Sequence, residues 1–138
     1  GQMPPSDIIR VYKILLSGEL DFVKTFRKTR HDGNQRIIVS RVYNTLFHLL
    51  FPLTPFRDIN SKPKMWSRNA LDRLKLNCTG WFSDGEIILE ARRLDFSFAE
   101  IPTVFFENEW RGSFVSVSTV FEMFFSLFLY RIIYWFKR

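Results

Sequence analysis

Apolar residues recur at helical spacing in the first part of the chain. The first series predicts a helix over residues 8–16, preceded by two prolines, capped by Ser6 or Asp7 and ended by Gly18. A second helix is predicted over residues 34–51, because a proline follows its last turn. Its buried side is expected to carry Ile37, Ile38, Val42, Leu46, Leu49 and Leu50.

Shorter apolar runs alternate with these helices and predict strands. Residues 20–25 and Met65-Trp66 each indicate a short strand, and a short helix opens at Ser67. Residues 83–94 have the spacing of a capping box, Ser83 with Glu86, at the start of a helix. Residues 96–106 are the best strand candidate, and the proline within them favours a sheet edge or a break. This order predicts an α/β domain with too few strands for a complete doubly wound sheet, so a front portion is expected to be missing.

The last apolar series is the longest and predicts one helix over residues 114–136. It divides the chain into a domain of residues 1–112 and a C-terminal segment of residues 113–138. An aromatic stripe of Phe121, Phe124, Phe125, Phe128, Ile132 and Trp135 lies on one face, with Glu122 on another. Arg131 interrupts the apolar run, which favours an amphipathic helix on a membrane surface over a transmembrane span or a core helix. Deleting residues 121–138 is then expected to raise solubility.

Charge adds an expected partner to this outline. Lys and Arg number 20 against 14 Asp and Glu, a net charge of +6, which indicates an anionic ligand or surface. The single Cys78 excludes an intramolecular disulfide and a cysteine-rich metal site. Binding to single-stranded nucleic acid is not favoured, because the aromatic residues lie in apolar stripes rather than among the basic ones.

Positive charge is concentrated in residues 21–40. Arg27, Arg30 and Arg36 flank an Asp-Gly-Asn turn between the predicted strand and helix. Side chains at the C-terminal edge of a strand and on the next helix meet in the crevice where α/β sheets bind ligands. A planar guanidinium holds phosphate through two hydrogen bonds, so these three arginines are predicted to line one cleft with Gln2 at its edge. The alternative is a solvated basic loop.

Several short motifs, in order along nearly the whole chain, resemble one enzyme family. They are Gln2 with Pro5, Phe26-Arg27-Lys28-Thr29-Arg30, Arg36 with Ser40, Lys64-Met65-Trp66-Ser67-Arg68, Trp81-Phe82-Ser83-Asp84-Gly85-Glu86 and Glu100-Ile101-Pro102. Together they are similar to family 2 glycosyltransferases of the dolichol-phosphate mannose synthase type, from just after the Asp-x-Asp motif. Trp110-Arg111-Gly112-Ser113 only approximates the family's next block, whose lysine is absent.

The resemblance implies a partial GT-A, Rossmann-like fold without its N-terminal nucleotide-binding part. It implies transfer of a sugar from a nucleotide-sugar to a polyprenyl or dolichyl phosphate at the cytoplasmic face of a membrane. A divalent metal, Mg or Mn, would be held mainly by aspartates outside this sequence, with Gln2 as a further ligand. This stretch alone is therefore expected to be inactive, and a membrane-subunit partner is a further expectation.

The resemblance also suggests roles for individual residues. Arg27, Arg30, Arg36, Ser40 and Arg111 would bind the substrate phosphate, where arginines offset the repulsion between two anionic groups. Arg36 and Asp84 would take part in catalysis, and Asp58 would orient the sugar hydroxyls or an arginine. Each has a plainer alternative, such as helix capping for Asp84. The rival function is a non-catalytic basic membrane-associated module that binds acidic lipid or a partner protein.

Overall fold

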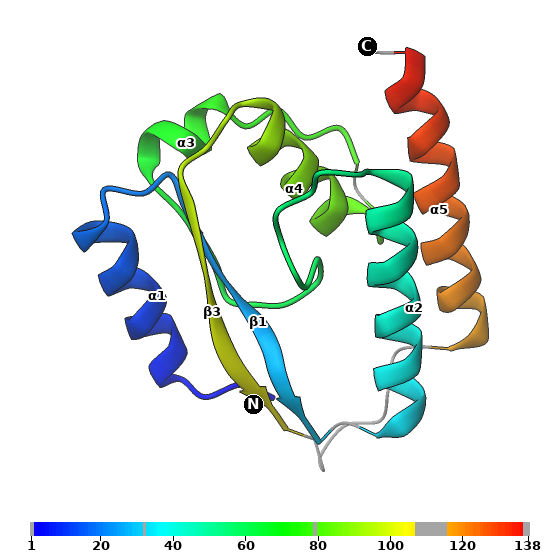
Figure 1. The fold of residues 1–138 in the computed structure, drawn as a ribbon, viewed down its shortest axis with the longest axis horizontal. Helices are drawn as coiled ribbons and strands as arrows, with labels where there is room; N and C mark the ends of the chain where they lie inside the picture. Colours follow the sequence, from blue (N-terminus) through cyan, green and yellow to red (C-terminus); the bar gives the residue numbers. More distant parts are fainter. Residues whose placement is uncertain (1, 32, 79, 107–115, 137–138) are drawn as a thin grey trace.

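The computed structural model describes residues 2–31, 33–78, 80–106 and 116–136. Its strands form one mixed three-stranded sheet in the order β2-β1-β3. The strands are β1 (Phe22–Arg30), β2 (Lys64–Trp66) and β3 (Phe98–Phe105). β1 pairs parallel with β3 and antiparallel with β2. Figure 1 shows α1 (Ser6–Ser17) on one side of this sheet and α2 (Asn34–Leu50) on the other.

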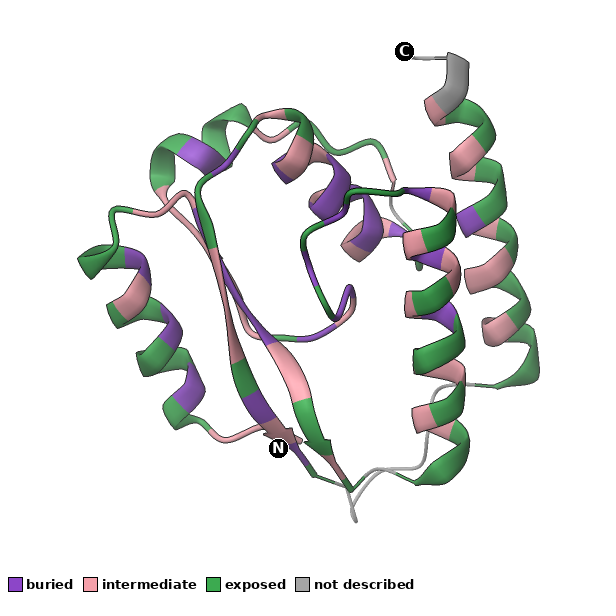
Figure 2. Ribbon diagram, viewed as in Figure 1, coloured by how far each residue is buried: buried purple, intermediate pink, exposed green. Residues whose placement is uncertain are grey.

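Neighbouring residues of β1 point to opposite sides of the sheet, so β1 contributes buried residues to both faces. Val23 packs with Val11 and Leu15 of α1 in a small cluster. Phe22 packs on the other side in the larger core, which includes Tyr43 and Phe47 of α2. Figure 2 shows the buried positions of the helices turned toward the sheet. The expected α/β class is confirmed, and β3 lies at a sheet edge as its proline predicted.

The first helix begins slightly earlier than predicted, and its capping differs. Ser6 and Asp7 both lie within α1, whose N-cap residue is Pro5 without a side-chain cap bond. Asp7 is buried and accepts hydrogen bonds from Thr103 and from Arg10, the latter at 2.6 Å. Asp7 therefore ties α1 to β3 instead of capping the helix.

β1 continues well beyond the six residues predicted for it. Its polar second half pairs with β3 up to Arg30, and in its first half the buried Lys24 forms an ion pair with Glu100 of β3 at 2.9 Å. The strand register shifts between Arg27 and Thr29, which is a β-bulge. In a regular strand, residues three apart point to opposite faces. The extra residue of the bulge lets Arg27 and Arg30 lie against the same ring, that of Phe105.

α2 has the predicted bounds within one residue, but its buried face is only partly as predicted. Leu46 and Leu50 pack against the core as expected, whereas Ile38, Val42 and Leu49 are exposed and Tyr43 and Phe47 are the fully buried residues. The two faces were confused because both carry apolar residues at helical spacing, and the larger aromatic side chains occupy the core.

The middle of the chain contains α3 (Arg68–Arg73), capped by Ser67 as predicted, and α4 (Ser83–Arg93). The capping box at α4 is not formed: Phe82 is the N-cap residue and Glu86 is fully buried. The Glu86 carboxylate accepts hydrogen bonds from the backbone N–H groups of Asn77 and Cys78 and from the Tyr130 hydroxyl. These bonds outweigh burial and lower its pKa.

The C-terminal helix α5 (Val117–Phe136) runs beside α2 (Figure 1) and shares its core. Leu127 is fully buried, Phe124 contacts Tyr43 edge-on, and Tyr130 donates a hydrogen bond to Glu86 at 2.8 Å. The opposite face exposes Phe121, Phe125, Phe128 and Ile132, four members of the predicted stripe. The sixth member, Trp135, has its side chain outside the described part. Among the described residues, α5 is the one helix with the length and composition of a membrane span.

Candidate anion-binding site

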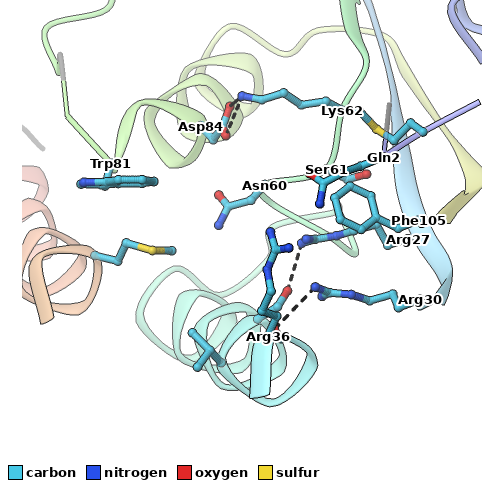
Figure 3. A pocket seen from close by; sticks show the side chains of 14 residues that line it. Gln2, Arg27, Arg30, Arg36, Asn60, Ser61, Lys62, Trp81, Asp84 and Phe105 are labelled. Atoms are coloured by element: carbon cyan, nitrogen blue, oxygen red, sulfur yellow. Dashed lines mark hydrogen bonds and ion pairs between the residues drawn. The ribbon is translucent and has the colours of Figure 1, made fainter. Parts of the chain in front are cut away.

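A pocket of about 400 Å³ lies at the end of β1 where α2 and α5 meet. The structure places six of the predicted site residues along it, from different elements (Figure 3): Gln2, Arg27, Arg30, Arg36, Ser40 and Asp84. The three arginines and Gln2 thus line one cleft, as predicted, rather than a solvated loop. Arg111 lies outside the described residues, and Asp58 lies behind the pocket instead of lining it.

Arg27 is held by contacts with Asp58, Ser40 and Phe105. Its guanidinium makes a two-pronged contact with the Asp58 carboxylate, Nε–Oδ2 at 2.6 Å and Nη2–Oδ1 at 2.7 Å. Its Nη2 also donates to the Ser40 hydroxyl at 3.0 Å. Phe105 lies under the guanidinium at 5.5 Å. Asp58 therefore orients an arginine, which was one of its two predicted roles, and fixes the direction in which Arg27 faces the pocket.

Asp58 is in turn fixed by groups from three other elements. The Glu100 carboxylate of β3 accepts the backbone N–H groups of Arg57 and Asp58 at 2.9 and 3.3 Å. Lys24 of β1 donates to the carbonyl oxygen of Asp58. From α2, Asn44 accepts the N–H of the next residue, Ile59, at 3.2 Å. The buried pair of Lys24 and Glu100 thus supports Arg27 through the backbone of Arg57 and Asp58.

Burial alone would raise the pKa of Asp58, but the hydrogen bonds and charge of Arg27, with Lys24, lower it from 3.8 to about 2. A carboxyl with a depressed pKa adds stability that is complete above its unfolded pKa and lost as the pH falls through its folded pKa. The contribution to the free energy of unfolding is about 2.5 kcal/mol at neutral pH.

We expect the free energy of unfolding, measured with urea, to fall between pH 4 and pH 2. The Asp58→Asn variant should lose less over that interval, and an identical pH profile would contradict this assignment.

Arg30 and Arg36 lie next to each other, close to Arg27. The Nη2 of Arg30 reaches the backbone carbonyl of Arg36 at 3.5 Å, and its guanidinium lies 5.8 Å from the Phe105 ring. The two side chains therefore belong to one cationic wall although a turn separates them in the chain (Figure 3).

Asp84 lies at the first turn of α4 and pairs with two lysines. Lys64 Nζ is 2.7 Å and Lys62 Nζ is 3.1 Å from its carboxylate. Lys64 is almost completely buried, and burial lowers its pKa to about 8 although Asp84 opposes the shift. Asp84 thus forms ion pairs on the pocket wall. It does not cap the helix, and these ion pairs do not assign it a catalytic role.

The pocket combines positive charge with an apolar wall. Of the described residues, four cationic side chains, those of Arg27, Arg30, Arg36 and Lys62, and one carboxylate, that of Asp84, line it. The remaining lining includes the apolar side chains of Met3, Val39, Trp81, Phe105 and Met123. Such a lining suits a ligand with an anionic group and an attached apolar part.

The expected divalent metal would be held mainly by residues outside this sequence. Among the described pocket residues, the Asp84 carboxylate is paired with two ammonium groups, and Gln2 offers a neutral amide oxygen. Hard cations prefer several free oxygen ligands. Among the described residues, no group of three His, Cys, Asp or Glu side chains is arranged to hold a metal ion.

Sequence reasoning did not single out several pocket residues: Asn60, Ser61, Lys62, Trp81, Phe105 and Met123. Asn60 to Lys62 lie between α2 and β2, and nothing in the sequence pattern indicates that this segment folds back onto β1. Met123 carries no chemical signal at all and reaches the pocket because α5 packs against α2.

Comparisons with models of known protein families, with curated proteins and with solved structures found no match for this chain.

Proposed function

We propose that the pocket binds the phosphate of a polyprenyl or dolichyl phosphate. We also propose that the chain is part of a GT-A glycosyltransferase that transfers a sugar to this lipid from a nucleotide-sugar. The observation that carries the proposal is the convergence of Arg27, Arg30, Arg36 and Ser40 on one pocket with an apolar wall. The order of the sequence motifs supplies the reaction class. Transfer would take place at the cytoplasmic face of a membrane.

In this proposal each side chain has a distinct role. Arg30 and Arg36 bind the phosphate oxygens, while Arg27, held by Asp58, contributes fixed positive charge beside Ser40. A lipid phosphate is already anionic, so its oxygen needs no strong base to attack the sugar. The required contribution is to hold two negative groups in line, which guanidinium groups provide by electrostatic stabilisation.

The proposal is tested by measuring binding of farnesyl phosphate to the chain by calorimetry. Arg36→Ala should weaken binding by about 10- to 100-fold, because charge-assisted hydrogen bonds to phosphate are lost. Arg41→Ala is the matched control, since Arg41 is exposed on the same helix and does not line the pocket. Thermal unfolding should be nearly unchanged in both variants.

Two results would contradict the phosphate site: equal losses for the two variants, or equal binding of farnesol and farnesyl phosphate. Sugar transfer itself is tested with protein that also carries an Asp-x-Asp segment ahead of Gln2. Phosphate-dependent binding without transfer by that protein would favour the basic lipid-binding module over the enzyme.

A further inference from the structure

α2 exposes an apolar stripe that the protein's own core leaves uncovered. Ile38, Val42 and Leu49 are 59%, 45% and 71% exposed, respectively, and lie four and seven residues apart, on one face. α2 carries Arg36 and Arg41 but no carboxylate. Its outer side is therefore apolar with positive charge beside it.

The exposed stripe of α5 faces the same side as that of α2. The helices are parallel neighbours, because Tyr43 meets Phe124 near their middles and Phe51 meets Tyr134 near their ends. Successive helical residues are rotated by about 100°. Val42 comes one residue before Tyr43, the contact residue of α2, and Phe125 comes one residue after Phe124, the contact residue of α5. In parallel helices these opposite rotations turn both side chains to one outer side.

We infer that α2 and α5 together form one lipid-facing surface, and that α5 lies flat on the membrane instead of crossing it. We define this outer face by its exposed apolar residues: Ile38, Val42, Leu49, Phe121, Phe125, Phe128 and Ile132. The inference extends the proposed membrane association but does not depend on the phosphate site.

The inner side of α5 argues against a span. A spanning helix is surrounded by lipid or by other spanning segments. α5 instead buries Leu127 in the core, bonds Tyr130 to Glu86 and contributes Met123 to the pocket wall. Crossing the bilayer would separate all of these partners, whereas lying in the interface keeps them and buries the outer face in lipid.

Charge favours an anionic bilayer as the occupant of the outer face. Arg36 and Arg41 lie on α2, and Arg30 and Lys62 line the adjoining pocket. Glu122, the one carboxylate of α5, lies about 100° around the helix from Phe121, at the border of the stripe. Cations beside an apolar helical face are the features of interfacial membrane binding.

The inference is tested by sedimentation of the full chain with vesicles of phosphatidylcholine and phosphatidylserine. Leu49→Glu and Phe125→Glu should each lower vesicle binding about tenfold, because each puts a charge where an apolar side chain enters lipid. Ile9→Glu is the matched control: Ile9 is 58% exposed, but α1 lies across the sheet (Figure 1). This control should bind vesicles within about twofold of the original chain.

Three outcomes would overturn the inference. A loss with Phe125→Glu but none with Leu49→Glu would leave α2 out of the lipid-facing surface. An equal loss with Ile9→Glu would indicate non-specific adsorption. If the chain self-associates without lipid and Leu49→Glu abolishes this self-association, the outer face is an interface between two copies. If a Glu variant does not fold by circular dichroism, Ile38→Ser replaces Leu49→Glu and Phe121→Ser replaces Phe125→Glu. Farnesyl phosphate binding, measured without vesicles, reports on the pocket separately.

Discussion

Removing residues 121–138 is expected to unfold the protein, contrary to the gain in solubility that the sequence suggests. Leu127 is fully buried, and Phe124, Tyr130 and Tyr134 pack against the main core. Loss of one buried leucine side chain typically costs about 2–5 kcal/mol, and a small domain has about 5–15 kcal/mol in all. The deletion also removes the Tyr130 hydroxyl from the buried Glu86 carboxylate.

We expect the truncated chain to show no cooperative thermal transition and to aggregate. The matched control replaces Phe121, Phe125 and Ile132 by serine, which removes exposed apolar groups and leaves the inner side of α5 intact. That variant should unfold within about 1 kcal/mol of the original chain in urea. A soluble, cooperatively folding truncation would show that α5 contributes little to the core.

Replacing Asp58 by alanine is expected to lower both stability and anion binding. Arg27 and Asp58 form a nearly buried pair, and removing one partner of such a pair costs about 3–5 kcal/mol. Without the carboxylate, the Arg27 guanidinium loses two hydrogen bonds and its fixed direction toward the pocket. Urea unfolding measures the first effect, and calorimetry with farnesyl phosphate measures the second.

Glu100→Gln tests how far Glu100 supports the Asp58 loop. The two carboxylate oxygens accept the N–H groups of Arg57 and Asp58 separately, so the amide, which has one oxygen, keeps only one of these bonds and also removes the charge that faces Lys24. If the Lys24–Glu100 pair stabilises the Asp58 loop, this variant should lose stability and shift the pH dependence assigned to Asp58. Unchanged stability together with an unchanged pH profile would contradict this support.

Most of the elements were predictable because they depend on local patterns. Helix α2, the Ser67 cap of α3 and the edge position of β3 follow from spacing, capping chemistry and proline. The failures have a shared cause in tertiary pairing. The polar residues after Thr25 look like a loop until β3 pairs with them, and Glu86 looks like a cap until Tyr130 reaches it.

The arginines of the candidate site could be predicted from the sequence, but the backbone arrangement that brings them together could not. Arg27 and Arg30 stand three apart, so alternation in a regular strand would have separated them, and the bulge that unites them has no clear sequence signal. The packing at Gly85 has no local signal either, because a Cβ there would lie 2.8 Å from Phe82 and 2.9 Å from Phe47, which is distant in the sequence.

The helices of the outer face also build the pocket. Arg36, Val39 and Ser40 come from α2, and Met123 comes from α5. Any membrane contact that alters how these helices sit must therefore alter ligand affinity. Thermodynamic linkage makes this effect reciprocal: the factor by which vesicles change the affinity for farnesyl phosphate equals the factor by which farnesyl phosphate changes the affinity for vesicles. The surface that locates the protein and the pocket that selects its ligand would then act as a single allosteric unit, with α2 and α5 as the shared element.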